Sequence, residues 1–152
     1  MPVNYICPRQ QGELDNPFDR DEQAMTALVT AGALVALADG RADAVERDEV
    51  LDYIDRRRLA PAVSRQRVAE FFDARVRQLQ DRDVTDLIVE AFRPVARLPL
   101  VSEVIRIGER TAAADGRLHP CELQVIALIR LLLMSEMRSG EKELRKGEKP
   151  KR

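Results

Sequence analysis

Apolar positions recur at helical spacing through most of the chain. Met25, Leu28 and Val29, for example, follow the i, i+3, i+4 pattern of a helix with one buried face. No stretch alternates polar and apolar residues for long enough to predict a strand. The pattern predicts helices over about Asp21–Asp39, Ala44–Arg58, Ala62–Gln80, the segment between Asp83 and Pro94, Pro99–Asp115 and Pro120–Met137. We therefore expect an all-α fold, a compact bundle of six or seven helices.

The same pattern divides the chain into three parts. Residues 1–20 contain prolines, a glycine and scattered charges, and are predicted to be an N-terminal extension. Residues 21–138 are predicted to form the helical domain. Residues 139–152 hold all the lysines, with six basic and three acidic residues, and are predicted to be a disordered basic tail.

The composition of the chain argues against several classes of function. The 152 residues carry 25 basic and 26 acidic side chains, so no overall field favours nucleic acid or an anionic membrane. Aromatic residues make up 4% of the chain, which leaves few platforms for stacking bases. No run approaches the roughly 20 apolar residues of a membrane helix, and the N-terminus lacks a secretory pattern. With only Cys7 and Cys121 as cysteines, we expect reduced thiols and a cytoplasmic protein.

The most informative feature is a repeat with an offset of 76 residues. The tetrapeptide Ala-Asp-Gly-Arg occurs at 38–41 and again at 114–117. At the same offset upstream, the apolar stripes coincide, including mid-helix glycines at Gly32 and Gly108. A glycine inside a helix costs about 1 kcal/mol relative to alanine, so we expect a close helix crossing at both positions. The repeat predicts a pseudo-twofold duplication of a helix, an Asp-Gly turn and a second helix.

One interpretation of the turns is purely structural. Gly40 and Gly116 would end their helices in the left-handed conformation. Asp43 and Glu46 would form a capping box at the start of the next helix, and Glu122 would stand in the corresponding first turn of the second copy. This interpretation needs no ligand.

The other interpretation is a cation site. Asp39 and Asp115 lie at predicted helix C-termini, where the macrodipole disfavours a carboxylate by roughly 0.3 to 1 kcal/mol. A hard divalent cation, with Ca²⁺ as a candidate, would make a carboxylate at this position favourable. In the first copy it would collect Asp39, Asp43 and Glu46, with Glu49 as an optional ligand. The site would not be an EF-hand, because apolar residues stand where that loop has its first ligands.

Both turns, the helix with Phe71 and Phe72 between them, and the small-residue helices leading into each turn resemble the TerB family, which is associated with tellurite resistance and stress. The resemblance covers about Asp21 to Met137. It implies an all-helical cytoplasmic domain with an acidic, metal-binding face, working beside a membrane partner of the TerC type rather than as an enzyme. The acidic residues that correspond by position are Asp39, Asp43, Glu46, Asp115 and Glu122.

The second turn departs from the family's pattern. The family's second turn is usually rich in carboxylates, but His119, Pro120 and Cys121 follow here, so Asp115 and Glu122 are its only acidic residues. His119 with Cys121 would suit a softer ion such as Zn²⁺, although His-x-Cys with one Asp is not a recognised ligand spacing.

The sequence thus predicts a non-enzymatic, TerB-like stress protein that presents carboxylates to a divalent cation and to a membrane-associated protein partner. The alternative is a metal-free helical interaction module. In that alternative the turns only cap helices, and either the acidic face or the apolar segment from Leu123 to Met137 docks another protein; the apolar segment would also suit a homodimer. An enzyme is the least supported class, because the chain has one histidine and no glycine-rich nucleophile elbow.

Overall fold

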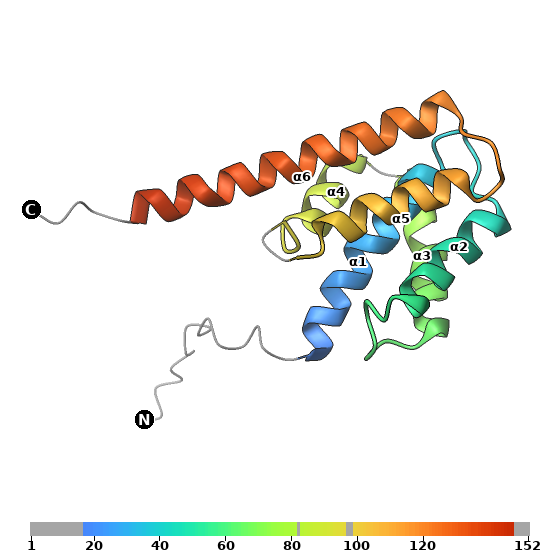
Figure 1. The fold of residues 1–152 in the computed structure, drawn as a ribbon, viewed down its shortest axis with the longest axis horizontal. Coiled ribbons are helices and arrows are strands. Elements are labelled where there is room, and N and C mark those ends of the chain that lie inside the picture. Colours follow the sequence, from blue (N-terminus) through green and yellow to red (C-terminus); the bar gives the residue numbers. More distant parts are fainter. Residues whose placement is uncertain (1–16, 82, 97–98, 148–152) are drawn as a thin grey trace, which may run out of the picture.

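The computed structural model describes residues 17–81, 83–96 and 99–147, and the side chains within these ranges from residue 19 to residue 139. The described residues form six helices packed as one compact all-α bundle, as the apolar spacing predicts (Figure 1). The helices are α1 (Pro17–Ala36), α2 (Ala44–Arg56), α3 (Arg65–Asp81), α4 (Val84–Phe92), α5 (Val101–Ala113) and α6 (Pro120–Gly147).

Helix α1 is the centre of the bundle and packs against every other helix (Figure 1). Its sequence from residue 24 to residue 36 is rich in alanine, and almost every side chain there is buried. Small side chains let the neighbouring helices approach from all sides. Among the larger residues, Met25, Leu28 and Val35 of α1 are completely buried, together with Phe72 of α3 and Phe92 of α4.

The two mid-helix glycines have different surroundings. A Cβ atom on Gly32 would lie 2.5 Å from a methyl group of Val50 on α2, so the predicted close crossing is confirmed at this position. A Cβ atom on Gly108 would lie 3.5 Å from Val35 and 3.6 Å from Ile126, which is ordinary van der Waals contact. The expected exclusion of a side chain at Gly108 is therefore wrong, because α5 and α6 pack less closely there than α1 and α2.

Several predicted helix boundaries are also wrong at their ends. Helix α1 ends at Ala36, before Asp39, because residues 37–40 form a separate turn. Helix α3 begins at Arg65 rather than near Ala62. The reason is a cap, since the Ser64 hydroxyl accepts a hydrogen bond from the backbone N–H of Arg67 (3.2 Å). Helix α4 stays within its predicted limits, ending at Phe92 before Pro94.

The largest difference concerns α6, which continues to Gly147 instead of ending near Met137. The segment that follows Met137 is rich in Glu, Lys and Arg, which are strong helix formers, so the helix continues although the composition changes. The predicted disordered tail is therefore helical up to Gly147, and its last five residues lie outside the described part of the chain. Figure 1 shows the C-terminal half of α6 extending beyond the rest of the bundle. Within the described residues, no helix combines the length and apolarity needed to cross a membrane.

Candidate cation site

The first Asp-Gly turn connects α1 to α2 and is closed by local hydrogen bonds. The backbone N–H of Gly40 donates to the carbonyl oxygen of Leu37 (2.9 Å), and Gly40 has a φ of 99°, which favours glycine. The Oδ1 atom of Asp39 accepts a hydrogen bond from the backbone N–H of Arg41 (3.2 Å). One oxygen of this carboxylate therefore stabilises the turn.

The second turn, between α5 and α6, has the corresponding bonds. The backbone N–H of Gly116 donates to the carbonyl oxygen of Ala113 (3.0 Å), and Gly116 has a φ of 77°. Asp115 Oδ1 accepts from the backbone N–H of Arg117 (2.9 Å). Both aspartates therefore have an ordinary structural role, as the purely structural interpretation predicts, and these bonds alone would not indicate a ligand.

Two glutamates follow the turns and are buried. Glu46 and Glu122 each occupy the third position of a helix, α2 and α6 respectively, and their exposed fractions are 1% and 0%. Glu46 Oε2 accepts a hydrogen bond from the backbone N–H of Asp43 (3.1 Å), and Glu122 Oε2 accepts from that of His119 (3.4 Å). This is the return bond of a capping box, predicted for the first helix and found at both. It binds only one oxygen of each carboxylate.

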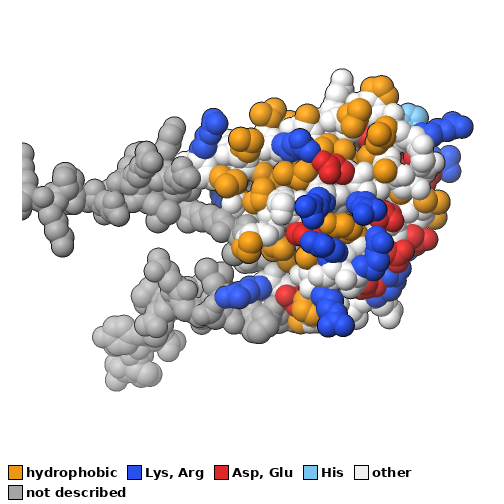
Figure 2. Space-filling view, in the orientation of Figure 1, with side chains coloured by type: hydrophobic (Ala, Val, Ile, Leu, Met, Phe, Trp, Pro, Cys, Tyr) orange, Lys and Arg blue, Asp and Glu red, His pale blue; other side chains and the backbone are white. Residues whose placement is uncertain are grey.

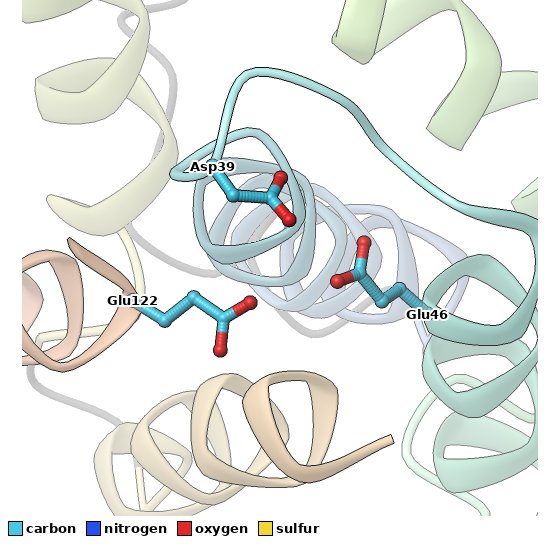
Figure 3. A group of neighbouring side chains, drawn as sticks. All are labelled: Asp39, Glu46 and Glu122. Carbon is cyan, nitrogen blue, oxygen red and sulfur yellow. The ribbon is translucent and has the colours of Figure 1, made fainter. Parts of the chain in front are cut away.

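The remaining oxygens converge. One carboxylate oxygen from each of Asp39, Glu46 and Glu122 lies within 4.8 Å of the others, and we call these three residues the acidic cluster. Figure 3 shows the three carboxylates pointing toward a common centre from three segments of the chain. The Oε1 atoms of Glu46 and Glu122 are buried and have no hydrogen-bond partner among the described residues. A buried carboxylate oxygen without a partner is costly, so the cluster is poorly satisfied by the protein alone.

The electrostatics of the cluster favour protonation or a cation. The pKa of Glu46 is raised from its usual value to about 7. Burial is the largest cause, the hydrogen bond from the Asp43 amide opposes it, and the nearby carboxylates of Asp39 and Glu122 add to the rise. Burial also raises the pKa of Glu122, and Asp115 and Asp39 contribute in the same direction. A bound cation would offset both the burial of these carboxylates and their mutual repulsion, because it supplies positive charge and a partner for the buried oxygens.

The structure brings together three of the five predicted acidic residues. Asp43 and Asp115 are exposed and lie outside the acidic cluster, although the charge of each still acts on the neighbouring glutamate. Glu49, the optional ligand, forms an ion pair with Arg56 (3.2 Å) instead. Cys121 is exposed at the start of α6.

Sequence reasoning missed the way the cluster is shared between the two turns. It assigned a separate ligand set to each copy, whereas Glu122 of the second turn joins Asp39 and Glu46 of the first. A signal for this was present, because Glu46 and Glu122 correspond at the offset of 76 residues and a twofold axis would bring such residues together. A second network was missed entirely: Glu103 of α5 accepts hydrogen bonds from the Tyr53 hydroxyl (2.6 Å) and from Arg57.

The fold and the acidic cluster define a class of protein, a small all-helical bundle with carboxylates buried beside its Asp-Gly turns. A family model described as "Tellurite resistance protein TerB" matches residues 22–139. The chain therefore belongs to the TerB family, as the resemblance of its turns predicts. No curated protein and no solved structure gives a match.

Proposed function

We propose that this TerB-family protein binds a divalent cation at the acidic cluster, with Ca²⁺ as the first candidate, and acts as a non-enzymatic cytoplasmic protein of tellurite resistance and stress. The observation that carries the proposal is the pair of buried Oε1 atoms on Glu46 and Glu122, which lack hydrogen-bond partners among the described residues. Their glutamates are held by helix starts far apart in the sequence, yet they point toward the same centre as Asp39 (Figure 3).

The distances fit a cation bound between the three carboxylates. Ca²⁺ lies about 2.3 to 2.6 Å from its oxygen ligands, so two ligands on one ion can be separated by up to about 5 Å. The oxygens of the acidic cluster lie within 4.8 Å of one another, inside that limit. Since Ca²⁺ takes six to eight oxygens, water and backbone carbonyls would complete its shell.

The capping bonds restrict how the glutamates can bind. Oε2 of Glu46 is engaged with the Asp43 amide, and Oε2 of Glu122 with the His119 amide. Each glutamate therefore offers one free oxygen, and bidentate coordination would break a hydrogen bond at a helix start. We expect an affinity weaker than that of a site with a bidentate glutamate.

We also infer that the two helix–turn–helix units are copies of one unit. The support is local: glycines with positive φ, the Asp side-chain bonds and the buried glutamates all correspond at the offset of 76 residues. A pseudo-twofold relation would explain why Glu46 and Glu122 meet beside Asp39. Under this proposal the cation site was created by the pairing of two units.

Calorimetric titration with Ca²⁺, Mg²⁺ and Zn²⁺, after treatment with a chelator, tests the cation proposal. Wild-type protein is expected to bind one Ca²⁺ with a submillimolar Kd, and Glu46→Gln with Glu122→Gln should weaken binding by more than tenfold. The matched control is Glu49→Gln with Glu90→Gln, which removes the same charge outside the acidic cluster and should leave Kd unchanged. Binding no tighter than millimolar, or equal binding by both double variants, would overturn the proposal.

The competing function, a metal-free interaction module, is favoured by a different observation. Figure 2 shows hydrophobic side chains gathered along the edge of the molecule where α6 runs. These large exposed side chains on α6 are Leu123, Leu128, Leu131, Met134 and Met137. An exposed apolar face of this kind is typical of a protein contact.

We propose that a membrane-associated protein, of the TerC type, occupies this face of α6. The support is that the face continues into a segment rich in Lys and Arg, which would be attracted to the anionic surface where such a partner lies. Leu131, with an exposed fraction of 67%, is the best position for a test. Leu131→Gln should weaken binding to a detergent-solubilised TerC-type protein at least tenfold. Unchanged binding, or a dimer in analytical ultracentrifugation that Leu131→Gln dissociates, would replace this partner with another or with a second copy.

A further inference from the structure

A second polar site lies between α2 and α5, outside the acidic cluster. It is a shallow cavity of about 500 Å³, within the size range of small-molecule sites, and it is lined by Tyr53, Arg57, Arg106, Glu109, Arg110 and Ala113. Three of the six lining residues are arginines. Figure 2 shows Lys and Arg side chains, with some carboxylates among them, gathered on the face that α5 crosses.

One of these arginines is held in position by a buried acid. Glu103, with an exposed fraction of 8%, accepts hydrogen bonds from the guanidinium of Arg57 and from the Tyr53 hydroxyl. Both carboxylate oxygens of Glu103 are thereby engaged, one by each partner. Because Arg57 is already ordered, a ligand that binds it would lose less conformational entropy on binding.

The other two arginines have less compensating charge. Arg106 and Arg110 lie one turn apart on α5, where like charges repel. Arg106 lowers the pKa of Glu103 through its charge, but the ion pair of Glu103 is with Arg57, and neither Arg106 nor Arg110 forms an ion pair within the described part of the chain. The remaining acid at the rim, Glu109, is paired with Arg130 of α6. The cavity therefore presents unbalanced positive charge on a fixed helix face.

We propose that this cavity binds a dianionic tetrahedral oxyanion, a phosphate either free or carried as a monoester by a small molecule. Guanidinium groups suit this ligand because their parallel N–H donors match two oxygens of a phosphate. Two charges on the ligand would balance Arg106 and Arg110, and Arg57 would supply further donors. A long nucleic acid is a poorer fit, since the chain has a net charge of −1 and few aromatic side chains for stacking.

The test is a titration with inorganic phosphate, followed by calorimetry and by backbone amide chemical shifts in NMR spectra at constant ionic strength. We expect saturable binding, with the largest shifts at Tyr53, Arg106 and Ala113. Arg106→Gln with Arg110→Gln should weaken Kd more than tenfold. The control, Arg77→Gln with Arg93→Gln, removes the same charge outside this cavity and should bind as wild type does. Thermal melts of each variant verify folding.

A second arm distinguishes the two sources of phosphate. Phenyl phosphate that binds more tightly than inorganic phosphate indicates a carried monoester, and equal or weaker binding indicates the free ion. In either case the proposal stands. It is overturned if neither probe saturates, if the largest shifts lie outside the cavity, or if the two double variants bind equally well. Single substitutions, Arg106→Gln and Arg110→Gln, provide the same comparison should the double variant fail to fold.

Discussion

The two Asp-Gly turns have the same hydrogen bonds but different roles. Asp39 and Asp115 each bond the backbone amide two residues ahead, and each turn is followed by a buried glutamate at the start of a helix. Only Asp39 joins the acidic cluster, however, while Asp115 lies outside it. Identical local structure therefore does not give identical chemistry, because the positions of the neighbouring helices decide which carboxylates meet.

The glycines upstream of the turns also correspond in sequence but differ in their surroundings. Gly32 is in close contact with Val50, whereas Gly108 has room for a methyl group beside Val35 and Ile126. The first helix pair is packed more closely than the second. Four predictions follow from these differences, and each compares a residue of the first unit with its counterpart in the second.

The largest effect is expected for Gly32→Ala. Its Cβ would lie 2.5 Å from Val50, whose branched side chain has little freedom to move, so overpacking should lower the free energy of unfolding by about 1 to 3 kcal/mol. Gly108→Ala should be neutral or stabilise by up to about 1 kcal/mol, since alanine is the better helix former. Urea denaturation of both variants measures the difference. Equal destabilisation would show that the two helix pairs are equally close.

The pH dependence of stability comes next. Folded Glu46, with a pKa of about 7, keeps a proton that the unfolded chain releases near pH 4.5, so unfolding releases a proton within this window. Stability should therefore fall as the pH rises from 5 to 7, by at most about 1.4 kcal/mol per pH unit for this proton. Above and below the window the contribution is constant.

Thermal melts at a series of pH values check this prediction. Glu46→Gln should flatten the decline, and Glu122→Gln should flatten it as well, because burial raises the pKa of Glu122 and the carboxylate of Glu122 raises the pKa of Glu46. Saturating Ca²⁺ should restore stability most strongly at the high end of the window, where the cluster is ionised. A wild-type profile that matches both variants would contradict the assignment.

The third comparison is between the two aspartates. Asp39→Asn removes a charge from the acidic cluster and should weaken Ca²⁺ binding about tenfold, which corresponds to about 1.4 kcal/mol. Asp115→Asn removes the same charge from the corresponding turn and should change Kd less than twofold. Calorimetry on the two single variants is sufficient. If Asp115→Asn has the larger effect, the site is centred on the second turn.

The smallest effect is one in which the two turns should agree. Gly40 and Gly116 both have positive φ, and a Cβ on either would meet no atom within 4 Å. Alanine at each should therefore cost only the backbone strain, about 1 kcal/mol. Chemical denaturation of Gly40→Ala and Gly116→Ala should give equal losses. Unequal losses would show that the turns differ in more than their surroundings.

Much of the fold could be predicted from local sequence, because helices and turns depend on residues close together in the chain. The apolar spacing gave the six helices, and the two glycines marked the turns. Boundaries were less accurate where a cap decides the start, as Ser64 does for α3, or where strong helix formers prolong a helix, as in α6. The capping bond of Glu46 was predictable for the same local reason.

The sequence by itself therefore determined the helices, the Asp-Gly turns and the identity of the acidic residues. Only the tertiary structure decided that the buried Glu46 and Glu122 meet beside the exposed Asp39, and that three arginines line one cavity between α2 and α5. The physical reason is that hydrogen bonds within a turn span a few residues, whereas contacts between helices depend on how closely whole faces pack. The small side chains of α1 allow the other helices to pack closely around it. This packing brings together the carboxylates of Glu46 and Glu122, which are 76 residues apart in the sequence.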